Sequence, residues 1–399
     1  MISWVGLFED EEVAGLAPLA TCRPVFELFL GTSRLIEKVS AFWPQVPLVL
    51  KTREWLSPLV RERFPLAMVD FPVGPGLLIN ARLVMTLSVF EQIQRVPEAS
   101  CLFQWKGTTV AAKLEHPALA SDLAQISPVY PLEKAIVLSK PWDLVAHNPQ
   151  VLTDELEQSE FLGHCPDTLG HHVSLVNPTK IGFGKNVQIE DFTYITAQNG
   201  PVYLADDVYV ESHTRLEGPL YIGPGTRILG GRIKSSTIGP ICKVGGEVSC
   251  SVISGLSNKG HDGFLGHSYL GYWVNLGAGT TTSNLKNTYG PIRAGQHNDP
   301  TDQVFLGSMM GDYVRTGIGT LLTCGSLIGT GSTLFGSTLH QKGILPFSWG
   351  ESHAYETCEI EGFLRALDRM MARRMGPVPP EEKAILTQYF QKIMKEAAQ

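Results

Sequence analysis

The chain has 399 residues, a formal net charge of −7 and a pI of about 5.9, and 43% of its residues are hydrophobic. This length exceeds one ordinary hydrophobic core, so two or three domains are expected. The acidic balance and the lack of any run of lysine and arginine exclude a nucleic-acid-binding protein from the expected classes. No apolar run is long enough to cross a bilayer, so no membrane partner is expected.

The N-terminus and the cysteines indicate a cytoplasmic protein. The first residues lack a basic region and become acidic at 9–12, so no signal peptide is predicted. Seven cysteines are scattered along the chain, and no two of them stand as C-x-x-C. An odd count without a pairing pattern is typical of reduced thiols.

Residues 1–150 show the alternation of an α/β domain. Short apolar runs predict strands at 2–8, 47–50 and 77–80, with a helical pattern at 34–39. Alternating strands and helices imply a mostly parallel sheet with covered faces. A β-hairpin is predicted at 101–113, where two apolar runs flank Lys106-Gly107. The pattern weakens from residue 141, and 151–175 are interpreted as a linker, with a short helix near the acidic stretch 154–157.

A period of six residues begins after the linker. Its longest run has five members at spacing six, which are Met310, Thr316, Leu322, Ile328 and Leu334. In a triangular β-helix each short strand turns one residue inward, and a small residue follows where the chain bends. Residues 176–345 are therefore predicted to form a left-handed parallel β-helix. The alternative is an all-β sandwich with glycine-rich turns.

Two segments depart from the period of six. Residues 283–303 are polar and have no inward residue, so we expect a loop that leaves the coil and that is suited to binding. Residues 346–399 are predicted to be mainly helical. One helix is expected at 359–374 and another after Pro379-Pro380, and they either cap the β-helix or pack on a neighbouring subunit.

The most informative motif lies within the repeats. His261-Asp262-Gly263-Phe264-Leu265-Gly266 precedes Asn275-Leu276-Gly277-Ala278-Gly279-Thr280, and Asn284 follows four residues after Thr280. This arrangement resembles the acyltransferase domain of the bifunctional N-acetylglucosamine-1-phosphate uridyltransferase / glucosamine-1-phosphate acetyltransferase family, whose motif runs H-x-x-Y-[LV]-G, then N-[LIV]-G-A-G-T, then an asparagine. The spacing matches without a gap when His261 takes the position of the histidine.

The resemblance implies a role for each matching residue. His261 becomes the catalytic base, and an alternate alignment that slips by one residue gives this role to His267. Donor binding, with acetyl-CoA as the co-substrate, falls to Ala278, Gly279 and Ser308. Acceptor binding falls to Asn275, Asn284 and Phe264, together with Lys286 and Arg293 of the polar loop. Two positions depart from the family, because Phe264 replaces a tyrosine and Ser249 replaces a lysine that contacts the sugar phosphate.

These residue types suit acyl transfer from a thioester to an amine. A histidine with a pKa near seven accepts the proton that the attacking nitrogen releases. Backbone N–H groups of residues 277–279 are candidate donors to the oxyanion. A zinc site at His213, His261 and His267 is an alternative, but the ligand spacing of zinc-binding trimeric β-helices is not reproduced. An exposed turn residue is the structural alternative for His261.

The start of the chain resembles a divergent branch of sugar nucleotidyltransferases. A strand ending in an acidic residue is followed by Pro18-Leu19 and then by Arg23-Pro24-Val25-Phe26-Glu27-Leu28, with Lys38 further on. The resemblance implies a shortened Rossmann-like nucleotidyltransferase head in which Arg23, Lys38 and Asn80 bind the nucleotide. The usual Gly-rich phosphate loop is absent, and Asn80 replaces a magnesium-binding aspartate. Mg is therefore a weaker expectation, and it is a possible cofactor of this domain alone. For Arg23 an ion pair with Glu27 is an equal alternative.

The sequence therefore predicts a sugar-phosphate N-acyltransferase, which moves an acetyl group from acetyl-CoA to an amino-sugar-1-phosphate, fused to a divergent nucleotidyltransferase head. Its partners would be a small sugar phosphate or nucleotide sugar. A homotrimer is expected from the family, whose acyl sites lie between neighbouring β-helices. The alternative is a non-catalytic trimer that binds a nucleotide sugar or serves as a scaffold on the same fold.

Overall fold

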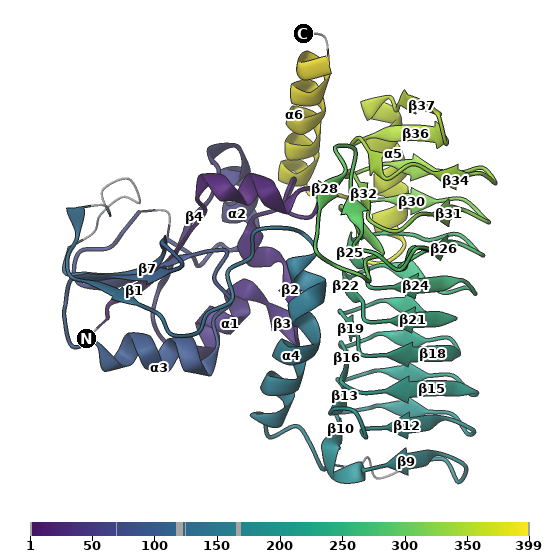
Figure 1. The fold of residues 1–399 in the computed structure, drawn as a ribbon, viewed down its shortest axis with the longest axis horizontal. Coiled ribbons are helices and arrows are strands. Elements are labelled where there is room, and N and C mark those ends of the chain that lie inside the picture. Colours follow the sequence, from purple (N-terminus) through teal and green to yellow (C-terminus); the bar gives the residue numbers. More distant parts are fainter. Residues whose placement is uncertain (1, 69, 117–122, 124, 165–168, 398–399) are drawn as a thin grey trace.

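An α/β head lies beside a long β-helix in the computed structural model, which describes residues 2–68, 70–116, 123, 125–164 and 169–397 (Figure 1). Two helices follow the β-helix at the C-terminal end. The predicted fold class is confirmed. Within the described ranges, no helix is both long and apolar enough to span a bilayer.

The head is built on one mixed sheet of six strands in the order β4-β1-β5-β7-β6-β8. Strand β1 pairs in parallel with β4 and β5, whereas β7 runs antiparallel to both β5 and β6. The predicted hairpin is therefore present and continues the parallel half of the sheet. The strands are β1 (Trp4–Phe8), β4 (Leu48–Lys51), β5 (Gly76–Asn80), β6 (Cys101–Trp105), β7 (Thr108–Leu114) and β8 (Val129–Pro131), and a small pair consists of β2 (Phe29–Leu30) and β3 (Ser33–Arg34).

Helices cover the sheet and connect it to the β-helix. Those of the head are η1 (Glu11–Leu16), η2 (Val25–Glu27), α1 (Leu35–Phe42), η3 (Glu54–Leu56), α2 (Ser57–Arg63) and α3 (Leu87–Arg95). The weak pattern after residue 141 forms α4 (Asp143–Glu157), a full helix that buries Leu144, Val151 and Leu152. Residue 150, the predicted end of the first domain, lies inside this helix, so no extended linker begins there. The proposed division into four domains stays a prediction.

The β-helix has three faces of stacked parallel strands. The first face contains β10 (Ile181–Phe183), β13 (Val202–Leu204), β16 (Leu220–Ile222), β19 (Thr237–Ile238), β22 (Val252–Gly255), β25 (Tyr269–Tyr272), β29 (Ser308–Met310), β32 (Ser326–Ile328) and β35 (Gly343–Ile344). The second face contains β11 (Gln188–Ile189), β14 (Tyr209–Val210), β17 (Arg227–Ile228), β20 (Lys243–Val244), β23 (Asn258–Lys259), β30 (Arg315–Thr316), β33 (Thr333–Leu334) and β36 (Ser348–Glu351), and β37 (Ala354–Thr357) pairs antiparallel with β36 at its end. The third face contains β9 (Ser174–Val176), β12 (Tyr194–Thr196), β15 (Thr214–Glu217), β18 (Gly231–Lys234), β21 (Glu247–Ser249) and β24 (Phe264–Gly266), followed by β26 (Thr281–Thr282), β31 (Leu321–Leu322) and β34 (Leu339–His340).

The period of six corresponds to one strand per face. The five residues of the longest run at spacing six lie on β29, β30, β31, β32 and β33 in turn, and all five are buried. Leu322, Ile328 and Leu334 belong to the continuous apolar column inside the coil. Because each coil buries its inward residues only against its neighbours, the repeat itself specifies this core.

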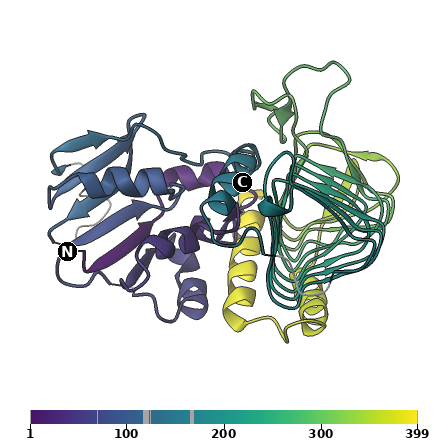
Figure 2. The ribbon, with the colours of Figure 1, turned by 90° about the horizontal axis from the view of Figure 1, so that it is seen from below.

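The polar segment 283–303 leaves the coil, as predicted, and it projects from the β-helix in Figure 2. It contains a short antiparallel pair, β27 (Arg293–Ala294) and β28 (Asp299–Pro300). The predicted C-terminal helices are α5 (Ile360–Ala372) and α6 (Pro380–Ala397). Helix α5 buries Phe363, Leu367 and Met371, and α6 lies between the head and the β-helix (Figure 2).

Head and β-helix meet at the first face. Tyr269 is fully buried there, accepts a hydrogen bond from the N–H of Phe29 at 2.9 Å and donates one to its carbonyl at 3.2 Å. The Thr237 hydroxyl donates to the carbonyl of Gly31 at 2.8 Å. Val252, Tyr269 and Met309 are part of the same hydrophobic cluster as the head's core, so the two parts share one interior.

Candidate functional site

Successive turns of the β-helix are stacked at the edge where the chain passes from the second face to the third. We call this the His261 edge; it consists of the turns 260–263, 277–280 and 317–320. The N–H of Gly279 donates to the carbonyl of Asp262 at 3.0 Å, and the N–H of Gly319 donates to the carbonyl of Ala278 at 2.7 Å. A Cβ on Gly263, whose φ is +128°, would lie 2.1 Å from the carbonyl oxygen of Thr280, so only glycine allows this close stacking. His261 is therefore one turn away from Ala278.

The amides of the 277–279 segment are not equivalent. The N–H of Gly277 donates to the carbonyl of Thr316 at 3.1 Å, and that of Gly279 is bonded to Asp262. Ala278 is exposed, and within the described part of the chain its N–H donates to no other group. Ala278 is thus the amide of this segment that is available to a ligand.

The turn that carries His261 is held from inside by a buried lysine. Lys259 occupies an inward position of the second face, in register with Val244. Only 3% of Lys259 is exposed, and its Nζ donates to the carbonyls of Gly245 at 2.9 Å and His261 at 2.6 Å. Burial lowers the pKa of Lys259 to about 8, although Asp262 acts in the opposite direction. A buried amine thus fixes the backbone of the predicted base.

The third face provides a shallow groove beside this edge. The groove is lined by Arg232, Glu247 and Phe264 of β18, β21 and β24, and by Asp262 of the His261 turn. Arg232 and Glu247 lie in register on neighbouring strands, as do Glu247 and Phe264. Arg232 also pairs with Glu217 at 2.7 Å, so the groove places a paired cation, two carboxylates and an aromatic ring next to the His261 turn.

His267 lies at the other end of β24. Its Nδ1 is 2.9 Å from the Nδ2 of Asn284, and its ring stacks on Phe305 with 5.1 Å between centroids. Burial and the neighbouring Lys234 lower the pKa of His267, so its neutral form is favoured. The structure therefore brings Asn284 to the alternate histidine, whereas the motif spacing had grouped it with His261. His267 opens into a separate recess lined by α4 and by residues 303–306.

The remaining residues of the predicted acyl site are dispersed. Asn275 lies on the second face, where its Oδ1 accepts a hydrogen bond from Asn258 Nδ2 at 2.9 Å. Ser308 is buried on the first face. Lys286 and Arg293 lie in the projecting loop, and Arg293 Nη1 donates to the carbonyl of Asn298 at 3.0 Å.

In the head, the ends of β1 and β5 carry polar residues that bond to one another. Arg82 Nε donates to Asp10 Oδ1 at 2.8 Å, and Arg82 Nη2 donates to Asp10 Oδ2 at 2.6 Å. Asn80 Nδ2 donates to the same carboxylate at 2.7 Å, while its Oδ1 accepts from the N–H of Arg82 at 2.9 Å. Burial raises the pKa of Asp10, but these hydrogen bonds outweigh it and the net pKa is lowered.

This arrangement does not fit a magnesium ion. Both oxygens of Asp10 accept hydrogen bonds from a guanidinium, and the amide oxygen of Asn80 is also engaged. Magnesium prefers carboxylate and water oxygens in open octahedral geometry. Within the described residues, no group of three or more His, Cys, Asp or Glu side chains is placed to hold a metal.

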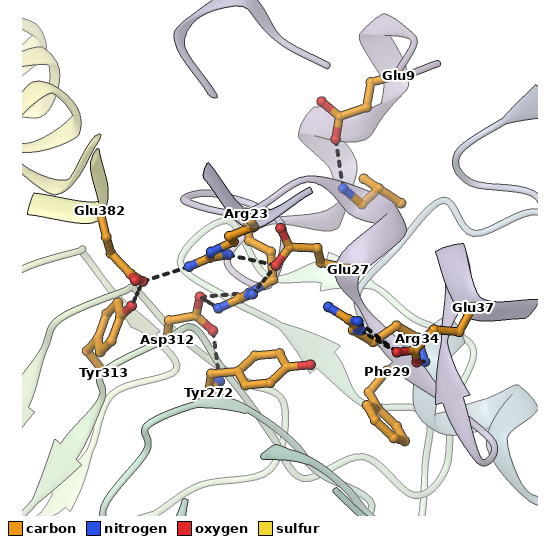
Figure 3. Close-up of polar contacts among 12 residues, drawn as sticks. Glu9, Arg23, Glu27, Phe29, Arg34, Glu37, Tyr272, Asp312, Tyr313 and Glu382 are labelled. Carbon is orange, nitrogen blue, oxygen red and sulfur yellow. Dashed lines mark hydrogen bonds and ion pairs between the residues drawn. The ribbon is translucent and has the colours of Figure 1, made fainter. Parts of the chain in front are cut away.

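Arg23 lies in a buried ion-pair cluster between the head and the β-helix (Figure 3). It pairs with Glu27, as the spacing of four allows, and with Asp312 of the β-helix, where Nη2 and Oδ2 are 2.8 Å apart. Arg63 pairs with Glu27 at 2.6 Å and with Glu382 of α6 at 2.8 Å. Burial and these carboxylates have opposite effects on Arg23, and its pKa is raised overall. The ion-pair alternative for Arg23 is therefore realised, with a second partner that the sequence did not indicate.

Lys38 is buried on α1 and pairs with Glu155 of α4. Both residues line a cavity of about 310 Å³, together with Phe42 and Lys134. Burial lowers the pKa of Lys38 despite the opposing effect of Glu155.

Sequence reasoning missed Lys259, Lys234 and Asp312. Lys259 had a detectable signal, because it stands at an inward position of the period that apolar residues otherwise occupy. Lys234 and Asp312 had none, since their neighbours lie far away in the chain.

Comparisons with known proteins agree with this architecture. A family model described as sugar nucleotidyl transferase matches residues 5–160. The bifunctional protein GlmU of Synechococcus elongatus is 29% identical over 196 residues, which are 42% of this chain and 39% of that protein. GlmU of Burkholderia vietnamiensis is 25% identical over 309 residues, or 65% of each chain. The chain thus spans about two fifths of the length of the Synechococcus elongatus relative.

Solved structures show a weaker likeness. The UDP-N-acetylglucosamine acyltransferase of Campylobacter jejuni has 12% sequence identity and a TM-score of 0.26, with 57% of this chain and 85% of that chain covered. A TM-score this low supports no inference about the present chain.

The head and the hexapeptide coil define a sugar nucleotidyl transferase-like domain joined to a parallel β-helix. Among known proteins this chain is similar to the bifunctional, GlmU-like family, and the resemblance inferred from the sequence is confirmed.

Proposed function

We propose that the protein is a sugar-phosphate N-acyltransferase that moves an acetyl group from acetyl-CoA to the amine of an amino-sugar-1-phosphate. One observation carries the proposal: the His261 turn is stacked directly on the turn in which the Ala278 N–H is available. A proton acceptor and an oxyanion donor are thereby presented on one edge, beside a groove that contains Arg232. The similarity to bifunctional GlmU proteins supports two activities in one chain.

The proposed reaction has one bond made and one broken. His261 accepts the proton as the sugar amine attacks the thioester carbonyl, and the C–N bond forms. The Ala278 N–H stabilises the negative charge that develops on the carbonyl oxygen. The C–S bond then breaks, and the thiolate of CoA leaves and takes up the proton from His261. Phe264 and Arg232 would hold the sugar ring and its phosphate.

We further propose a cytoplasmic homotrimer, with the loop residues Lys286 and Arg293 acting at the boundary between subunits. The six cysteines in the described part of the chain are free thiols, which suits a reducing compartment. The loop projects from the coil and is therefore accessible to a neighbouring copy. Analytical ultracentrifugation tests the trimer directly.

We propose that the head is a divergent sugar-1-phosphate nucleotidyltransferase domain. The family match to residues 5–160 supports this. Because Asp10 and Asn80 are bonded to Arg82, nucleotide or metal binding at the strand ends requires Arg82 to move first. Release of pyrophosphate from UTP and a sugar-1-phosphate, with and without Mg, measures this activity separately from acyl transfer.

The decisive experiment measures CoA release from acetyl-CoA and glucosamine-1-phosphate. His261→Ala should lower kcat/KM by roughly 10²–10⁴-fold, the usual contribution of a general base. His267→Ala is the matched control, since it removes the histidine at the other end of β24, and a smaller loss is expected. If only His267→Ala abolishes turnover, the base is His267. If the wild-type protein releases no CoA with any amino-sugar phosphate, the proposed function is wrong.

A further inference from the structure

The C-terminal end of the β-helix contains a cavity of about 430 Å³ between the second face and helix α5. Its walls include Arg315, Thr333 and Trp349 of the face, and Gly362 and Phe363 of α5. The residues of the His261 edge do not line it. The cavity is therefore a separate feature of the molecule.

Arg315 is the unusual residue in this cavity. Its Nε is buried without a hydrogen-bond partner, and the guanidinium makes no ion pair with any residue that the structure describes. The buried Arg23 and Arg82 differ, because each contacts a carboxylate. Burying one N–H donor of a cation without a partner is costly, and an anion bound to the guanidinium would offset this cost.

Neighbouring groups leave room for such an anion. Glu356 and Glu359 also line the cavity, but both are exposed and neither pairs with Arg315. Helix α5 begins at this cavity, and its N-cap residue Glu359 makes no side-chain hydrogen bond to the first turn. The free amides of that turn add a favourable partial charge, which Glu361 in the same turn partly offsets.

We propose that this cavity binds a small oxyanion with an apolar body, either a phosphate monoester or a carboxylate, through Arg315. The anionic group lies against the guanidinium, where two parallel N–H donors suit either headgroup. The apolar body lies between the rings of Trp349 and Phe363; the latter already lies 5.5 Å from the guanidinium carbon of Arg315. This site is independent of the proposed acyl transfer.

The test uses the full-length protein with phenyl phosphate and benzoate as probes, against sodium chloride at equal ionic strength. A probe at about ten times its Kd should raise Tm by roughly 2 °C. The larger rise identifies the preferred headgroup. If neither probe raises Tm beyond the chloride control, the proposal is overturned.

Three variants assign the effect to the cavity. Arg315→Gln should abolish the rise, while Arg227→Gln should retain it, because Arg227 is an exposed arginine on the same face and stacks on Tyr209. Gly362→Leu fills the cavity with Arg315 intact, and a leucine is favoured over glycine in a helix, so folding should be preserved. Loss of the rise in Gly362→Leu supports the site. Retention of the rise in both Arg315→Gln and Gly362→Leu overturns it.

Discussion

The head and the β-helix each carry polar residues at a candidate binding position. The two sets differ in whether their polar groups are already hydrogen-bonded to one another. At the strand ends of the head, Asp10, Asn80 and Arg82 bond to one another. At the His261 edge, the histidine is exposed and the Ala278 N–H is available. A group that is already paired must lose its partner before it can bind substrate. The comparison therefore favours the β-helix as the part of the molecule that is ready for chemistry.

The largest effect is expected where the head and the β-helix share charges. Arg23→Met leaves Asp312 buried without its cation, while Glu27 retains Arg63. We expect a loss of about 3–5 kcal/mol in the free energy of unfolding, as for other broken buried ion pairs. Urea unfolding measures it.

The control for Arg23→Met is Arg95→Ala, which breaks an exposed pair with Glu91 and should change stability by less than about 0.5 kcal/mol. A stable Arg23→Met protein that has lost UTP binding would instead support the nucleotide-binding role of Arg23 and weaken the contrast between the two regions.

The second test removes the free amide of the β-helix. Ala278→Pro has no N–H, so the oxyanion loses its donor, and kcat should fall by about 10²–10³-fold. Ala278→Ser retains the N–H and serves as the control, with activity within a few-fold of wild type. Circular dichroism verifies that the coil is intact. Equal activity of both variants would mean that the oxyanion is stabilised elsewhere.

The third test concerns the buried Lys259. Its pKa of about 8 in the folded protein lies below the value of about 10.4 expected in the unfolded chain. Between these pH values the unfolded chain binds more protons, so stability should rise with pH from about 8 to 10 and should be lowest below pH 8. The expected amplitude is about 2–3 kcal/mol.

Lys259→Met keeps the length of the side chain in the apolar column and removes the charge, so the pH-dependent rise should vanish. Denaturant unfolding at several pH values measures this. A parallel loss of CoA release would show that the hydrogen bond from Lys259 to the carbonyl of His261 positions the base. An unchanged pH profile would exclude Lys259 as its source.

The smallest effect is expected at the contact between the head and the first face. Tyr269→Phe removes the hydroxyl that bonds to the N–H and the carbonyl of Phe29. A loss of about 1–2 kcal/mol is expected, because two buried backbone groups lose a partner. Thermal unfolding monitors it. Separate melting of head and β-helix in this variant would show that the hydroxyl couples the two parts.

Local patterns determined the β-helix. The inward residues from Met310 to Leu334 follow one another at spacing six, and each packs against neighbouring coils. The hairpin at Lys106-Gly107 and the helix before residue 374 are equally local. The stacking of His261 on Ala278 also follows from coil length, because turns one coil apart must lie on the same edge.

Only the tertiary structure decided the partners of the charged and polar residues. Arg23 and Asp312 are 289 positions apart, and they meet because the head docks on the first face of the β-helix. Asn284, by contrast, is 17 positions after His267 and meets it by the same coil length that stacks Ala278 on His261, so this pairing was within reach of the sequence. Arg315 has no partner among the described residues, and its sequence neighbours give no sign of this. A repeat fixes what each residue faces within its own coil, whereas docking of distant segments fixes which charges are paired and which remain free to bind.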